Sequence, residues 1–139
     1  MSRSGYVDGY GDDDPLELGQ WRAQVASAIR GRRGQAFLRE LAAAMDAMPE
    51  KVLIADELID ENGDCCTIGV VCKARGLDVK GVDVECAETV GNLVGIAYQL
   101  AAEIEHLNDE GSVRDETPEQ RWSRMRRWVE RNVRPESKQ

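Results

Sequence analysis

Thr117-Pro118-Glu119-Gln120-Arg121-Trp122 opens the segment that most clearly sets the helical character of this chain. The Thr117 hydroxyl can accept an amide hydrogen bond as N-cap, Pro118 suits the first helical position, and Gln120 completes a capping box. We therefore predict an amphipathic helix over residues 117–134, with one face packed and the other cationic. The packed stripe contains Trp122, Met125, Val129 and Val133, and the cationic side contains Arg124, Arg127, Arg131 and Arg134.

Length and composition indicate a single domain. The chain has 139 residues, of which 42% are hydrophobic and 32% charged, the balance of a globular protein. We predict a flexible acidic arm at 1–14, a globular domain at 15–135 and a short tail at 136–139. No apolar run approaches the roughly 20 residues of a membrane span, and the first residues lack an apolar signal core. These features favour a cytoplasmic protein with no membrane partner.

Charge alternates in blocks along the chain. The net charge is −8, and it is distributed as −4 over 1–20, +4 over 21–40, −6 over 41–64, 0 over 65–87, −6 over 88–116 and +4 over 117–139. The two basic blocks can pair with the acidic blocks, or they can converge into one basic patch. Both arrangements remain open on this evidence.

Apolar periodicity predicts further helices. Leu18 to Ile29 forms a first helix that ends near Gly31, and a second helix from Phe37 is stopped by Pro49. A short loop between them indicates a helical hairpin. The most strongly apolar repeat predicts one long helix over 85–107, in which the spacing of Gly91 and Gly95 favours a close helix crossing.

A β-hairpin is predicted in the middle of the chain. The apolar runs 52–55 and 65–68 flank a polar segment containing Asn62-Gly63, and Asn-Gly between such runs is a strong turn signal. A short helix from Gly69 to Arg75 follows. The predicted fold class is α+β, a helix-dominated single domain with this small hairpin. We expect its core to contain Trp21, Val25, Phe37, Leu41, Leu93, Ala97, Leu100, Ile104, Trp122 and Val129.

Several stretches resemble a family of small uncharacterised proteins of tailed bacteriophages and prophages. They are the opening at residues 1–6, the segments Ser27-Ala28-Ile29-Arg30-Gly31-Arg32-Arg33-Gly34-Gln35-Ala36-Phe37-Leu38-Arg39 and Met45-Asp46-Ala47-Met48-Pro49-Glu50-Lys51, and the close at 116–122. The resemblance spans nearly the whole chain and departs mainly around Cys65-Cys66 and 79–86. It carries no activity, cofactor or site residue to this sequence. What it implies is an accessory protein acting in the cytoplasm of an infected bacterium.

No motif for catalysis, metal binding or cofactor binding is present, so we predict a protein that is not an enzyme and has no cofactor. The four cysteines lack zinc-ligand spacing, and we interpret them as core or near-core residues. The segment 60–64 begins like a calcium loop, but its glycine falls at the wrong position and Val71 replaces the final glutamate. Triads, P-loops and dinucleotide fingerprints are also missing.

Two functional hypotheses remain. The first is binding of a host or bacterial defence protein by an acidic surface that competes for a basic groove. Its predicted residues are Asp56, Glu57, Asp60, Glu61 and Asp64. The alternative is a small anion, nucleotide or nucleic-acid binder, because arginines around a glycine turn before a helix N-terminus can hold a phosphate. Its predicted residues are Arg30, Arg32 and Arg33, assisted by Arg124 and Arg127 of the C-terminal helix.

Overall fold

The computed structural model describes residues 15–112 and 115–135, and this part of the chain contains six α-helices. No strand occurs within the described ranges, so the fold there is all-α and the predicted α+β class is wrong. The predicted arm at 1–14 and tail at 136–139 lie outside the described residues. The helices are α1 (Pro15–Arg30), α2 (Arg32–Asp46), α3 (Thr67–Ala74), α4 (Ala87–Val94), α5 (Tyr98–Glu110) and α6 (Pro118–Asn132).

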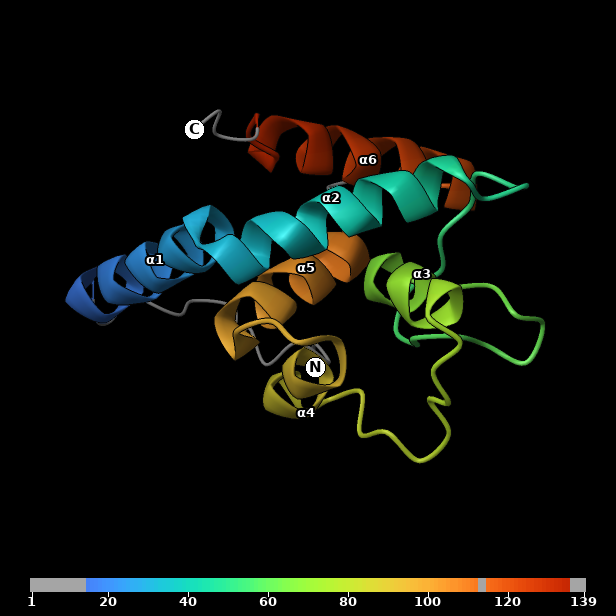
Figure 1. Ribbon diagram of the computed structural model, residues 1–139, viewed down its shortest axis with the longest axis horizontal. Helices are drawn as coiled ribbons and strands as arrows, with labels where there is room; N and C mark the ends of the chain where they lie inside the picture. The colour runs from blue at the N-terminus through green and yellow to red at the C-terminus, as the bar shows by residue number, and fades with distance from the viewer. Residues whose placement is uncertain (1–14, 113–114, 136–139) are drawn as a thin grey trace.

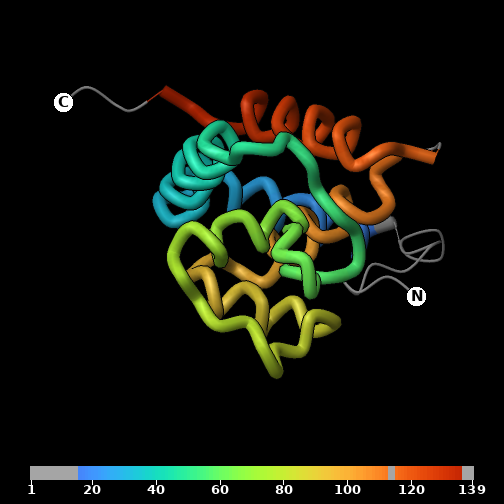
Figure 2. The backbone as a smooth tube through the Cα atoms, turned by 90° about the vertical axis from the view of Figure 1, so that its right-hand side faces the viewer, coloured from blue at the N-terminus to red at the C-terminus, as the bar shows by residue number. Residues whose placement is uncertain are grey.

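Helix α5 lies at the centre of the arrangement and contacts α1, α3, α4 and α6. Helix α6 runs alongside α2 on one side of the molecule, and α4 lies on the opposite side (Figure 1). The view turned by 90° shows the same order, with the chain between α3 and α4 far from α6 (Figure 2). The fold is therefore helix packed on helix around a single core.

The first two predicted helices are present, but α2 begins at Arg32, earlier than predicted, and the two do not make a hairpin. Gly31 alone separates α1 from α2, and α2 continues away from α1 at an angle instead of folding back along it (Figures 1 and 2). Antiparallel helices need a connection of about two to five residues to reverse the chain direction. A single linking residue is too short for that reversal.

The predicted long helix over 85–107 is divided into α4 and α5. Gly95 adopts a left-handed conformation with φ 83°, and its N–H donates to the carbonyl oxygen of Gly91 at 2.8 Å. A left-handed residue of this kind ends a helix because the next amide can no longer continue the helical hydrogen bonds. The close approach expected at Gly91 occurs within the connection itself, since a Cβ there would lie 2.8 Å from the carbonyl oxygen of Ile96.

The predicted β-hairpin is replaced by an irregular loop and the start of a helix. One isolated antiparallel bridge joins Ile59 and Cys65, and Cys66 then caps α3, its Sγ accepting the N–H of Gly69 at 3.4 Å. The apolar run therefore becomes helical from Thr67 onward. Such a short run cannot be assigned to strand or buried helix by periodicity alone.

Asn108 of α5 supplies the hydrogen bonds that a partner strand would have made. Its Oδ1 accepts from the N–H and the hydroxyl of Thr67 at 3.1 and 2.7 Å, and its Nδ2 donates to the carbonyl oxygen of Ile54 at 2.9 Å. The side chain is fully buried, so these bonds satisfy groups that water cannot reach. One residue of α5 thus joins the middle of the α2–α3 loop to the first residue of α3.

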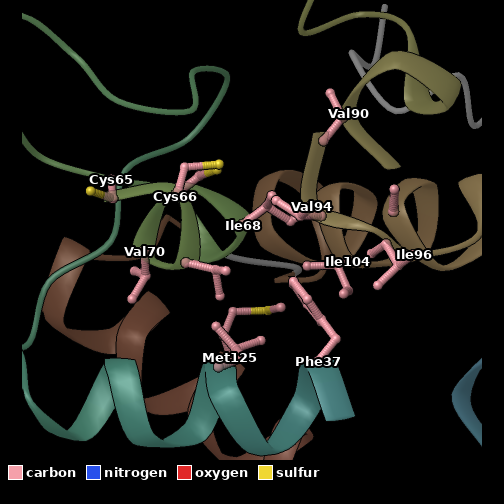
Figure 3. Packing of buried hydrophobic residues seen from close by; sticks show 14 of the residues in the cluster. Phe37, Cys65, Cys66, Ile68, Val70, Val90, Val94, Ile96, Ile104 and Met125 are labelled. Carbon is pink, nitrogen blue, oxygen red and sulfur yellow. The ribbon is translucent and has the colours of Figure 1, made fainter. Parts of the chain in front are cut away.

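Most of the predicted core is confirmed, since seven of its ten residues belong to the hydrophobic cluster or pack against it and Trp21, Val25 and Ala97 do not. None of its ten residues is exposed: six are buried and four are half-buried. Figure 3 shows side chains from several helices converging around Ile68 and Val94, with Cys66 pointing toward them and Cys65 pointing to the other side. Three of the four cysteines are buried and Cys86 is half-buried, which confirms their interpretation as core or near-core residues.

Candidate functional site

The five carboxylates predicted to bind a partner lie in the irregular α2–α3 loop, and we call residues 56–64 the acidic loop. Asp60 closes a tight turn, because its Oδ1 accepts the backbone N–H groups of Asn62 and Asp64, each at 2.9 Å. The N–H of Asp60 also donates to the carbonyl oxygen of Asp64 at 2.9 Å. The turn predicted at Asn62-Gly63 is therefore present, although the flanking strands are not.

Two neighbouring elements hold the acidic loop in place. Lys73 of α3 donates from Nζ to the carbonyl oxygen of Gly63 at 2.8 Å. At the other end, the N–H of Asp56 donates to Oδ1 of Asp109 at 3.1 Å, and Asp56 has a φ of 70°. A left-handed conformation is uncommon outside glycine and persists where the surroundings enforce it. The carboxylates are thus carried by an ordered backbone.

The carboxylates of the acidic loop are exposed or half-buried, and none has an ion-pair partner in the part of the chain that the structure describes. Asp56, Glu57 and Glu61 are exposed, while Asp60 and Asp64 are half-buried. Within residues 15–112 and 115–135, none of these five side chains takes part in an ion pair. The loop is therefore a source of uncompensated negative charge.

Other acidic residues are neutralised by arginines, two of them from distant parts of the chain and one from a nearby segment. The bonded pairs are Arg75–Glu40 at 2.6 Å, Arg126–Asp46 at 2.9 Å and Arg124–Glu116 at 2.8 Å. In each pair the hydrogen bond from the arginine lowers the pKa of the carboxyl group below its ordinary value. Two of these pairs, Arg126–Asp46 and Arg124–Glu116, join a basic block to an acidic block. In the third pair the arginine, Arg75, comes from the neutral block and its partner Glu40 from a basic block.

Arg30, Arg32 and Arg33 remain at the surface around Gly31, where α1 gives way to α2. The C-terminal end of α6 lies beside this basic turn because Gln35 joins the two. Gln35 donates from Nε2 to the carbonyl oxygen of Asn132 at 2.9 Å. The structure therefore places the C-terminal end of α6 next to the basic turn.

Arg124 is not part of the basic turn. Its guanidinium is bound to Glu116 and donates to the carbonyl oxygens of Leu107 at 2.6 Å and Asn108 at 3.2 Å, so it caps the C-terminus of α5. Arg127 is exposed on α6. Of the two assisting arginines in the alternative hypothesis, Arg124 is thus already engaged within the fold.

A groove of about 410 Å³ adjoins the acidic loop. It lies between the C-terminal end of α2, the following segment and α3, and we call it the α2–α3 groove. Its apolar wall includes Met48, Val52 and Val70, and Asp64 and Lys73 also line it. Asp64 therefore belongs both to the groove and to the acidic loop.

The chain does not match any of the family models, curated proteins or solved structures with which it was compared. Function therefore has to be inferred from the surfaces and side chains described above.

The buried thiols are poorly suited to nucleophilic chemistry. Burial raises the pKa of Cys65 to about 11 and that of Cys72 to about 12, so both are protonated near neutral pH. In the described ranges, His, Cys, Asp and Glu side chains do not gather in threes as a metal site requires. None of the described helices is both long and apolar enough to cross a membrane.

Sequence reasoning missed the residues that position these surfaces: Gln35, Lys73, Asn108 and Arg121. Arg121 donates from Nε to the carbonyl oxygen of Asn108 at 2.9 Å, and the bonds of the other three span separations from 10 to 97 residues. Sequence spacing carries no signal for such partners. The one feature of these residues visible in the sequence is that they are polar and lie next to apolar positions.

Proposed function

We propose that this protein acts by binding another protein through its acidic loop. The observation that carries this proposal is the contrast in charge pairing: Glu40, Asp46 and Glu116 are bound by arginines, whereas the acidic loop has no such partner among the described residues. An ordered cluster of unpaired carboxylates raises the association rate with a basic surface. The partner therefore presents a basic patch, such as a groove that otherwise holds nucleic acid.

The setting of this binding rests on the sequence resemblance to phage and prophage proteins. On that basis, the partner is a host or bacterial defence protein in the cytoplasm of the infected cell, and the chain acts without catalysis. An acidic protein of net charge −8 that occupies a nucleic-acid groove inhibits by competition.

The test reverses the exposed charges of the loop. We expect the triple variant Asp56→Lys, Glu57→Lys, Glu61→Lys to lose partner capture from infected-cell lysate. The association rate with the captured partner should fall roughly ten-fold or more at low salt, because electrostatic steering is lost. Asp60 is left unchanged because its carboxylate closes the turn.

The matched control places the same three charge reversals elsewhere. Glu85, Glu88 and Glu119 are exposed and lie outside the acidic loop, so their replacement by lysine gives the same net charge. This control should retain capture. Equal capture by both triple variants, at low and at high salt, would count against the acidic loop as the binding surface.

The basic turn supports a second candidate, binding of a phosphate-bearing anion. Arg30, Arg32 and Arg33 are exposed at the N-terminus of α2, where the backbone amides favour an anion. Calorimetry with mono-, di- and cyclic nucleotides and short oligonucleotides should then give heat that Arg33→Glu abolishes. Arg22→Glu, an exposed change on α1, is the control. Absence of heat from the folded, unchanged protein rejects this candidate.

A further inference from the structure

We infer that the α2–α3 groove receives an apolar side chain of the protein partner, in a segment where lysine or arginine flanks that side chain. This inference rests on the proposed function and adds a second, uncharged contact to it. It follows from the position of the groove, its lining and the charges at its edge.

The groove is suited to an apolar anchor. Met48, Val52 and Val70 give it an apolar wall, and its volume of about 410 Å³ can hold large side chains. Pockets that bind organic ligands commonly measure roughly 300–1,000 Å³. In protein interfaces, an apolar or aromatic side chain buried in such a pocket often contributes most of the binding energy.

The charges at the groove select the residues beside that anchor. Glu50 and Asp64 line it, and Asp64 continues directly into the acidic loop with Glu61 and Glu57. Lys73 is the cation of the groove, and its ammonium group is held by the carbonyl oxygen of Gly63. Carboxylates outnumber it along this edge, so cationic residues flanking the anchor are favoured and acidic residues are repelled.

The same charges disfavour a second copy of this chain as the occupant. Each copy carries a net charge of −8, so two acidic surfaces brought together would repel. The anchor and the flanking charges also have separable effects. The carboxylates mainly change the association rate, whereas a buried apolar anchor mainly changes the dissociation rate.

The probe is a short synthetic peptide with two central leucines flanked by lysines, titrated into ¹⁵N-labelled protein and followed by NMR. We expect amide shifts to concentrate at Met48, Val70 and Lys73. A peptide with alanines in place of the leucines has the same charge, and its affinity should be lower by about ten-fold or more. Equal binding by the two peptides, shifts centred elsewhere or no binding by the leucine peptide overturns the groove inference.

A matched pair of variants tests the groove within the protein. Ala74 is an exposed residue that lines the groove, and Ala43 is an exposed residue of α2 that does not. Ala74→Phe should fill the groove and weaken the leucine peptide about ten-fold, whereas Ala43→Phe should not. Equal affinity in the two variants, with both shown to be folded by their amide spectra, contradicts the inference.

The two proposals fail in different ways. Suppose that the acidic-loop triple variant loses partner capture while Ala74→Phe shows normal capture and dissociation. This result supports the proposed function and rejects the groove inference. Faster dissociation of the partner in Ala74→Phe than in Ala43→Phe supports the groove. Capture that is unaffected by the loop reversals removes the proposed function itself. Light scattering that shows peptide-independent dimers broken by Ala74→Phe would assign the groove to a second copy and overturn the inference.

Discussion

Single residues in this protein are fixed by contacts with distant parts of the chain. Gly69 in the first turn of α3 shows this most directly, because a Cβ there would lie 1.9 Å from the carbonyl oxygen of Leu58. That carbonyl also accepts the N–H of Cys66 at 3.0 Å. The acidic loop can approach α3 this closely because Gly69 has no side chain.

Gly69→Ala should destabilise the fold by more than about 2 kcal/mol, because the loop must move and its hydrogen bonds must lengthen. The control is Gly19→Ala on α1, where no atom lies within 4 Å of the added Cβ. Alanine there should stabilise the helix by about 0.5–1 kcal/mol. Urea unfolding measures both effects, and equal midpoints for the two variants would contradict this account.

At the scale of elements, α6 begins with the predicted capping box, but part of its basic side binds within the fold. The capping box of Thr117 and Gln120 is confirmed, with the Thr117 hydroxyl accepting the N–H of Gln120 at 3.1 Å. The apolar stripe is confirmed as well, since Met125 and Val129 are buried. The cationic side is not uniformly free, because Arg124 caps α5 and Arg126 binds Asp46.

Arg124→Met should therefore destabilise the protein by about 1–3 kcal/mol. The carbonyl oxygen of Leu107 loses its side-chain donor, and Glu116 keeps only the longer contact of 3.4 Å with Arg121. The side chain of Glu116 is only 8% exposed, so water cannot fully replace the guanidinium. Arg127→Met changes an exposed arginine on the same helix and should stay within about 0.5 kcal/mol. Chemical denaturation of the two variants gives the comparison, and similar losses would argue against a capping role for Arg124.

For the whole molecule, ion pairs between arginines and carboxylates make stability depend on pH. Arginine hydrogen bonds lower the pKa of three carboxyl groups, those of Glu40, Asp46 and Glu116. Their ordinary values are 4.5 for Glu and 3.8 for Asp. Above these values both the folded and the unfolded chain are ionised, and the pairs contribute fully. Below them the unfolded chain takes up protons first, so stability is lost as the pH falls.

The free energy of unfolding should thus decrease between pH 5 and pH 3, and Glu116 should contribute most because its side chain is the least exposed of the three. Glu116→Gln removes one titrating group and should show a smaller loss over this interval than the unchanged protein. Urea unfolding at a series of pH values measures both slopes. Parallel curves for the two proteins would show that Glu116 is not responsible.

The sequence by itself determined which segments have a strong helical period and where several of them begin and end. Caps, prolines and apolar spacing are local, so α1, α2, α3, α6 and most of the core residues were predictable from them. The tight turn at Asp60 was also local, because an aspartate side chain bonds to amides only a few residues away.

Tertiary structure decided the all-α class, the break at Gly95 and the role of each charge. Thr67 and Ile68, predicted as strand, became the start of α3, and Asn108, far along the chain, bonds to Thr67 and Ile54. The acidic loop stood out as a candidate site only once the arginines had been assigned to Glu40, Asp46 and Glu116. Charge pairing depends on distances in space that the linear sequence does not specify, and this is why its alternating blocks left both arrangements open.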